Sequence, residues 1–216
     1  MSLDDKVNDK ESEGFIKKSL KIGWKLGMAA ATTALSLATV GTTGILVGGG
    51  LAGGRIIGNL IKKKSFYETA SDALTAYSAV NTVIAPMVWL GNATYPLISM
   101  DTLAGKVARS VYALTAYNAA FVGSYRGATH LIDNYLNPKG ITKSITDNFY
   151  NEWKRIGAVF APGYILDALK ISPFGIAPFA LNAPFAGFYN ATKPVPVGKK
   201  SEHGNYVPQY SPAAAH

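Results

Sequence analysis

The chain has 216 residues, of which 48% are hydrophobic and only 16% are charged, an apolar balance for a soluble protein. It contains no cysteine, which excludes disulfides, thiolate metal sites and thiol nucleophiles. The formal net charge is +8, and the basic residues flank apolar segments instead of alternating with aromatic ones. We therefore expect the chain to contact membrane lipids with anionic headgroups, and we expect no nucleic acid partner.

The charge pattern divides the chain into three parts. Residues 1–14 are polar and predict a disordered tail, residues 15–192 predict a helical membrane domain, and residues 193–216 predict a mobile tail of Pro, Lys and Tyr. The expected fold is all-α. It is that of a small polytopic membrane protein with about three to four embedded helices, a Gly/Ala-rich first helix and a Pro-interrupted C-terminal segment.

Residues Phe15 to Lys25 alternate apolar and lysine side chains. This pattern is typical of a short collar at the membrane surface, with Lys25 reaching the phosphates and Trp24 lying at the headgroup level. We interpret Trp24 and Lys25 as interfacial anchors. A soluble amphipathic helix has the same pattern and is the alternative.

The 29 residues from Leu26 to Gly54 carry no charge and consist mainly of Ala, Thr, Gly, Leu and Val. A helix needs about 20 apolar residues to cross a bilayer, so the length is sufficient. Small residues recur at spacings of four, which lets two helix backbones approach closely inside a membrane. The glycines that we expect to pack against another helix, in the same chain or in a second copy, are Gly44, Gly48, Gly49, Gly50, Gly53, Gly54 and Gly58.

Other interpretations of this glycine-rich run remain. A flexible loop is one, and a nucleotide-binding turn at Gly48, Gly50 and Gly53 is another, although no strand-turn-helix unit or downstream acidic residue supports the turn. Basic residues lie on both sides of the run, the second set between Arg55 and Lys64. The run is therefore either a single span or a re-entrant hairpin that returns both basic ends to one face.

The second uncharged run extends from Ala73 to Met100. Pro86 lacks a backbone N–H and predicts a kink near residues 82–85. The polar and proline residues that follow predict that this helix ends close to Trp89 or Leu90.

A third helix is predicted from Leu103 to Leu136. It can span a membrane if the side chains of Arg109 and Arg126 reach outward along their apolar stems. The heptapeptide at 73–79 recurs at 113–119 with six of seven residues unchanged. This similarity is either a coincidence in an Ala-rich chain or a duplication that presents Tyr77 and Tyr117 in equivalent places.

Arg126, His130 and Asp133 have the spacing i, i+4 and i+7, so they share one face of this helix. Ionisable groups at membrane depth are costly and often serve as ion or proton relays. This face is the best candidate for a functional site, and the alternative is that the helix simply emerges into water here.

The C-terminal third contains a polar amphipathic segment, 141–155, in which we expect Trp153, Lys154 and Arg155 to be interfacial anchors. The run from Ile171 to Thr192 holds three prolines and predicts irregular backbone packed on protein or lying at the interface. A kinked fourth span is the alternative.

The sequence shows no phosphate-binding loop, nucleophile elbow or metal-ligand spacing. We therefore expect no enzyme activity, no metal and no cofactor. The expected function is that of a non-catalytic integral membrane structural or assembly protein, a homo-oligomer or a small subunit of a membrane complex. A channel or transporter that uses the Arg126, His130 and Asp133 face is the alternative, followed by a lipid-acting enzyme, and a soluble helical bundle would remove the membrane premise.

Overall fold

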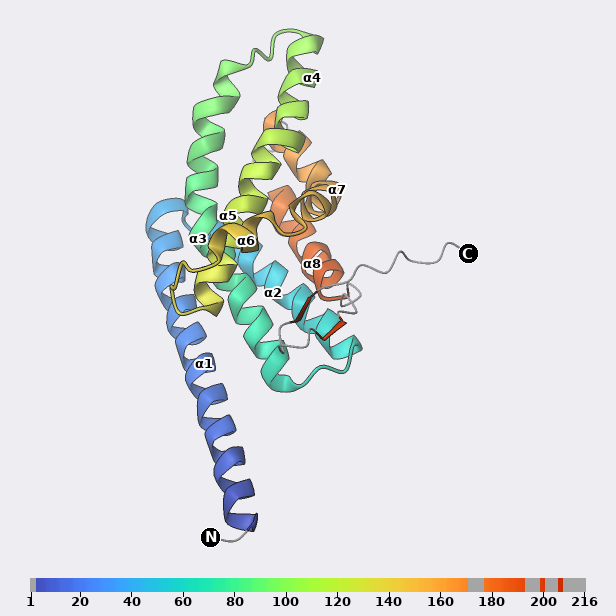
Figure 1. Ribbon diagram of the computed structural model, residues 1–216. Coiled ribbons are helices and arrows are strands. Elements are labelled where there is room, and N and C mark those ends of the chain that lie inside the picture. Colours follow the sequence, from blue (N-terminus) through green and yellow to red (C-terminus); the bar gives the residue numbers. More distant parts are fainter. Residues whose placement is uncertain (1–2, 171–176, 193–198, 201–205, 208–216) are drawn as a thin grey trace.

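The computed structural model describes residues 3–170, 177–192, 199–200 and 206–207, and its body is all-helical. In Figure 1, α1, α2, α3 and the continuous helix from α4 to α5 alternate in direction, and α7 and α8 lie to one side of them. The helices are α1 (Leu3–Val40), α2 (Thr43–Ile61), α3 (Phe66–Thr94), η1 (Tyr95–Leu97), α4 (Leu103–Tyr112), η2 (Ala113–Tyr117), α5 (Asn118–Asp133), α6 (Ile141–Thr146), α7 (Phe149–Ala168) and α8 (Ala177–Thr192).

The N-terminal end of the chain is helical, and the C-terminal end is described only in part. Helix α1 begins at Leu3, so most of the segment predicted as a polar tail, 1–14, forms the first turns of a helix. The predicted tail 193–216 lies outside the described residues except for two short strands. These strands, β1 (Lys199–Lys200) and β2 (Tyr206–Val207), pair antiparallel, with Lys199 opposite Val207.

The uncharged run from Leu26 to Gly54 is a helical hairpin and not one helix. Helix α1 ends at Val40, and Gly41 has a φ of +63°, a conformation that glycine adopts without steric cost. Helix α2 then returns in the opposite direction (Figure 1). The uncharged part of α1 is about 22 Å long at 1.5 Å per residue, shorter than a bilayer core of about 30 Å. The structure therefore excludes a single helical span over this whole run.

Helix α3 continues past its proline. The predicted end near Trp89 is wrong, because the helix contains Pro86 in its interior and ends at Thr94. The backbone carbonyl of Met87 accepts a 2.8 Å hydrogen bond from the hydroxyl of Tyr117. This hydrogen bond holds α3 against η2 one residue after the proline.

The start of α3 is fixed by reciprocal hydrogen bonds. The Ser65 hydroxyl accepts from the Glu68 backbone N–H at 3.2 Å, and the Glu68 carboxylate accepts from the Ser65 N–H at 3.0 Å. We expect Ser65→Ala to lower the free energy of unfolding by about 1 kcal/mol, because the Glu68 backbone N–H loses the hydroxyl that accepts its hydrogen bond. Thermal and denaturant unfolding in detergent micelles would measure this loss. Ser19→Ala, at an exposed position within α1, is the control and should change stability by less than about 0.5 kcal/mol.

The predicted helix from Leu103 to Leu136 is present but ends at Asp133 and contains five residues of π-helix, η2. The expectation that Arg109 reaches outward is wrong. Its side chain is only 2% exposed, and its guanidinium lies over the ring of Tyr95, 5.2 Å from the ring centre. An aromatic ring face attracts a desolvated cation, and this attraction stabilises the inward orientation of the Arg109 side chain.

The two similar heptapeptides differ in structure. The copy at 73–79 lies in regular α-helix, whereas the copy at 113–119 contains the π-helical turn. The hydroxyl of Tyr77 is 2.9 Å from that of Thr33 on α1, whereas Tyr117 is bonded to α3. The two tyrosines therefore do not occupy equivalent places.

The proline-rich C-terminal segment is helical where it is described. Helix α8 contains Pro184 in its interior, so Ala177–Thr192 is helical and not irregular backbone. Pro173 lies outside the described residues. Small residues of α8 face α2 and allow the two helices to pack closely.

The interior of the bundle combines an apolar core with several buried polar side chains, and large apolar side chains also lie outside. Asn59, Asn81 and Asn118 are fully buried. In contrast, Trp89 and Leu181 are 70% and 73% exposed. Two segments of the described chain, Thr43–Ile61 and Phe66–Leu97, are long and apolar enough to cross a membrane.

Candidate functional site

The predicted polar face of α5 lines a cleft of about 440 Å³. Arg126, His130 and Asp133 all contribute to it, as their helical spacing requires. Arg55 of α2 and Glu152 of α7 lie on other walls of the same cleft. The described hydrogen bonds join none of the three α5 residues to another. Each of them bonds to other parts of the chain.

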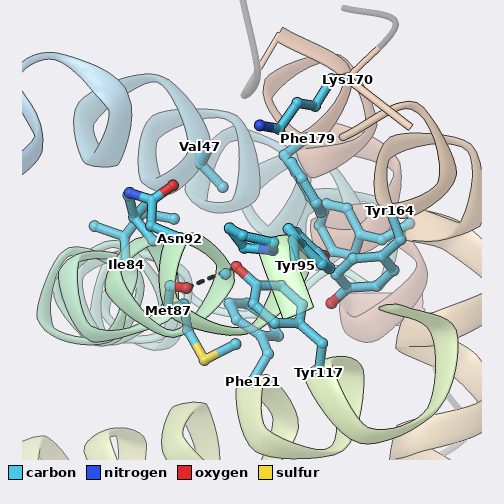
Figure 2. Close-up of a pocket in the computed structure, with 14 residues that line it drawn as sticks. Val47, Ile84, Met87, Asn92, Tyr95, Tyr117, Phe121, Tyr164, Lys170 and Phe179 are labelled. Carbon is cyan, nitrogen blue, oxygen red and sulfur yellow. Dashed lines mark hydrogen bonds between the residues drawn. The ribbon is translucent and has the colours of Figure 1, made fainter. Parts of the chain in front are cut away.

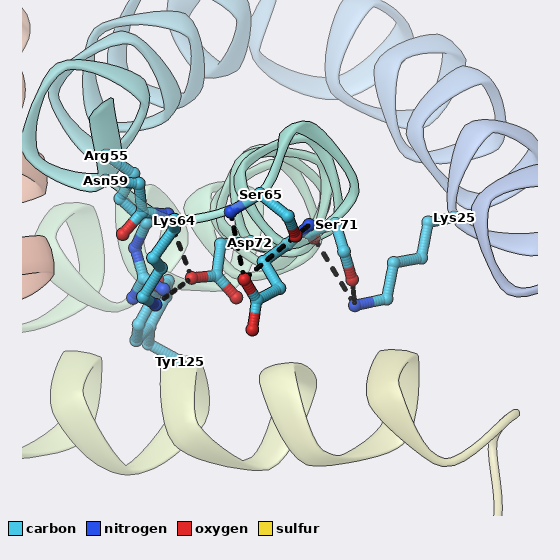
Figure 3. Close-up of polar contacts among 9 residues, drawn as sticks. Lys25, Arg55, Asn59, Lys64, Ser65, Ser71, Asp72 and Tyr125 are labelled. Atoms are coloured by element: carbon cyan, nitrogen blue, oxygen red, sulfur yellow. Dashed lines mark hydrogen bonds and ion pairs between the residues drawn. The ribbon is translucent and has the colours of Figure 1, made fainter. Parts of the chain in front are cut away.

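Asp133 ties α5 to α1 and α3. Its Oδ1 accepts hydrogen bonds from the Lys25 ammonium at 2.5 Å and from the Thr75 hydroxyl at 3.1 Å. Lys25 also donates to the Ser71 hydroxyl at 2.7 Å, a contact visible in Figure 3. The Lys25 side chain is 2% exposed and that of Asp133 is 37% exposed. The structure thus places Lys25 inside the bundle, where an ion pair satisfies it, and not at the lipid surface where we expected an anchor.

Arg126 and His130 fix the segment that follows α5. Arg126 donates through Nε to the Ser144 carbonyl at 2.7 Å and through its terminal nitrogen to the Asp147 carbonyl. His130 Nε2 is 3.0 Å from the Lys139 carbonyl, which can only accept, so Nε2 carries the hydrogen. In the neutral imidazole, His130 Nδ1 then accepts from the Ser144 hydroxyl at 2.7 Å. Both ring nitrogens are used within the chain, so a proton relay through this imidazole would have to break one of these bonds.

A second set of polar contacts joins α2 to α3 and α5, and the sequence did not single it out. Asp72 Oδ2 accepts from Asn59 Nδ2 and from Lys64 Nζ, each at 3.0 Å (Figure 3). The Arg55 guanidinium donates to the Tyr125 hydroxyl at 3.1 Å. Asp72 borders the second uncharged run, and its place beside the basic residues that close α2 is the signal that could have identified this pairing.

The predicted tryptophan anchors also bind within the chain. The indole N–H of Trp24 donates to the Ile132 carbonyl at 2.8 Å, and that of Trp153 donates to the Thr115 carbonyl at 3.1 Å. Both tryptophans are partly buried, so each holds one helix against another. The two basic neighbours lie over aromatic rings, Lys154 at 4.3 Å from the Tyr150 ring centre and Arg155 at 5.5 Å from that of Tyr189.

Glycines of α2 lie against different neighbouring helices. A Cβ atom added at Gly44 would overlap the side chains of Ser36 and Asn81, and one at Gly48 would lie 2.9 Å from Asn81 Nδ2. These two glycines thus allow α2 to approach α3 and the end of α1.

Gly50, Gly54 and Gly58 face α8. An added Cβ would lie 3.0 Å from the Ala183 Cβ at Gly50 and 2.5 Å from the Ala191 Cβ at Gly58. At Gly54 it would overlap the Pro184 carbonyl oxygen. Helix α8 offers small residues at the same spacing of four, Ala183, Gly187 and Ala191, so the two backbones are in contact along three turns.

Gly49 and Gly53 differ from the other glycines of the predicted packing set. An added Cβ at either position would meet no atom within 4 Å. They lie on the outer side of α2 with three large exposed residues, Leu46, Ile57 and Leu60, which are 58%, 54% and 60% exposed. We define these five residues as the outer face of α2. No contact within the described chain accounts for the small residues on this face.

The site residues therefore hold the bundle together at one end and leave apolar faces outside. Among the described residues, no group of three or more His, Asp or Glu side chains could hold a metal ion. No protein-family model, curated protein or solved structure matches this chain.

Proposed function

We propose that this chain is a non-catalytic integral membrane protein that takes part in membrane assembly by associating with copies of itself through the outer face of α2. The observation that carries the proposal is the set of large apolar side chains on the outside of the bundle, which the described chain leaves uncovered. Soluble monomers rarely expose large contiguous apolar patches. Here Leu46, Leu181 and Phe185, on the paired helices α2 and α8, are 58%, 73% and 69% exposed. In lipid, these exposed apolar side chains avoid the unfavourable free energy of contact with water.

The outer face of α2 is suited to contact between copies. In lipid, helices gain little from apolar side chains alone, because the lipid tails are equally apolar. Close approach at small residues supplies the missing dispersion contacts. Gly49 and Gly53 offer such a place, and Leu46 and Ile57 lie beside them to pack against a partner.

The first experiment tests membrane location by carbonate extraction of membranes from cells that express the full chain. We expect the wild-type protein to stay in the membrane pellet. Leu46→Lys should reduce membrane-inserted protein strongly, because a lysine facing the bilayer centre costs about 2.5–3.5 kcal/mol. Leu136→Lys, at an equally exposed position beyond the end of α5, should have no such effect. Wild-type protein in the carbonate supernatant would contradict the proposal.

The second part of the experiment tests self-association by chemical cross-linking in detergent followed by sizing. We expect a defined oligomer for the wild type and its loss in the double variant Gly49→Ile and Gly53→Ile. These positions have space for a side chain within one chain, so the fold should persist. Gly27→Ile, at an open position on α1, is the control and should retain the oligomer. A double variant that cross-links like the wild type would contradict the role of this face.

A further inference from the structure

A separate cavity of about 350 Å³ lies between α2, α3 with η1, η2 with α5, α7 and α8. It falls within the range of about 300–1,000 Å³ that is usual for small-molecule sites. Figure 2 shows its lining side chains converging from these helices around an open centre. Its inner part is formed by apolar residues such as Val47, Ile84 and Met87.

Aromatic rings form one wall of the cavity. Tyr95, Tyr117, Tyr164 and Phe179 follow one another, with successive ring centres 5.4, 5.9 and 5.0 Å apart. The hydroxyl of Tyr117 donates to the Met87 carbonyl at 2.8 Å. The hydroxyl of Tyr164 donates to the side-chain oxygen of Asn118, a residue outside the lining set, at 3.1 Å. The hydroxyls of these two tyrosines are therefore bonded to protein groups, and their rings present apolar surface to the cavity.

The rim of the cavity is polar and carries positive charge. Lys170, just after α7, and Asn92, near the end of α3, both line it and are both exposed. Figure 2 shows the Lys170 amino group above Phe179. No acidic residue is among the described residues that line this cavity. An apolar interior with a cation at its entrance is complementary to an amphiphile with an anionic head.

The size of the cavity suits one hydrocarbon chain. An apolar cavity of about 150 Å³ holds benzene, so six carbons take about 150 Å³ and a space of 350 Å³ takes about 14. We propose that this cavity binds a long-chain carboxylate, whose hydrocarbon chain enters between the aromatic rings and whose carboxylate pairs with Lys170. The inference does not depend on membrane location or on self-association.

The test uses the full chain in a neutral detergent and palmitate that carries a photoreactive diazirine in its chain. After irradiation, peptide mass spectrometry should find the label on cavity residues such as Met87 and Tyr95, and excess unlabelled palmitate should remove at least four-fifths of it. Val88→Trp, which fills the cavity, should lower labelling at least fivefold, whereas Val111→Trp on the outside of α4 should leave it unchanged.

The charge of the head is tested separately. Lys170 lies at the surface. Lys170→Gln should lower labelling by the carboxylate at least threefold, while labelling by the corresponding photoreactive alcohol stays the same. Lys143→Gln, at an exposed site on α6, is the control. Label spread over the outer faces and insensitive to Val88→Trp would overturn the cavity assignment. Equal labelling by acid and alcohol, unaffected by Lys170→Gln, would overturn the anionic class.

Discussion

Gly54→Ala is expected to destabilise the protein by about 3 kcal/mol, a large effect for the addition of one methyl group. The new Cβ would overlap the Pro184 carbonyl oxygen and lie 2.7 Å from the Phe188 backbone nitrogen. Both are backbone atoms of α8, so no side chain can rotate away, and the two helices must separate along their contact. The free energy of unfolding, measured by denaturant titration in micelles, reports this cost.

Gly53→Ala on the same helix is the matched control, and its effect should have the opposite sign. No atom lies within 4 Å of the added Cβ, and alanine stabilises a helix interior by about 0.5–1 kcal/mol relative to glycine. The two variants differ by one position and share the same change in intrinsic helix preference. If both stabilised the protein equally, α2 and α8 would not be packed as the structure has them.

A reciprocal change on α8 extends the argument. The Cβ of Gly187→Ala would overlap the Leu51 carbonyl oxygen, so it should destabilise the protein as Gly54→Ala does. Both substitutions open the same helix contact. The stability lost in the double variant should therefore be smaller than the sum of the losses in the two single variants. This non-additivity separates a shared interface from two unrelated defects.

The glycine run illustrates what the sequence could and could not predict. Spacings of four predicted that α2 approaches another helix, because the helical period alone fixes which residues share a face. The partner helix was not predictable, since Gly54 meets a segment about 130 residues later in the chain. The break at Gly41 was equally hidden. Glycines occur on both sides of it, and no local pattern marks Gly41 as the one with a positive φ.

The polar face shows the same limit. The spacing of Arg126, His130 and Asp133 placed them together on α5, and they do line one cleft. Their partners come from α1, α3 and the α6 region, at sequence distances that no local pattern encodes. Lys25 was interpreted as a surface lysine because its neighbours are basic and apolar. Its burial depends on a carboxylate 108 positions away.

Asp133→Asn is expected to destabilise the bundle by about 3 kcal/mol or more, since it leaves a buried ammonium without its counter-ion. The Lys25 side chain is 2% exposed and cannot reach water without opening the contact between α1 and α5. Its remaining partners are the hydroxyl and the carbonyl of Ser71, at 2.7 and 3.3 Å. Neither carries a charge, so the cost of desolvating the cation is no longer offset.

Lys25→Met should cost much less, although it breaks the same ion pair. Methionine fills a similar volume with apolar atoms, and the Asp133 side chain, 37% exposed, can turn to water. The carboxylate also keeps the Thr75 hydroxyl as a donor. Lys64→Met provides the control for an ion pair at the surface, because Lys64 is 33% exposed and such pairs contribute about 0–1 kcal/mol.

The double variant Lys25→Met and Asp133→Asn decides between an ion pair and two independent contributions. If burial of the unpaired ammonium is what makes Asp133→Asn severe, removing that ammonium should restore most of the lost stability, and the double variant should be more stable than Asp133→Asn alone. Additive losses would mean that Asp133 stabilises the fold through Thr75 and its own helix instead of through Lys25. The order of the three variants therefore tests whether α1 is held to the bundle by this charge.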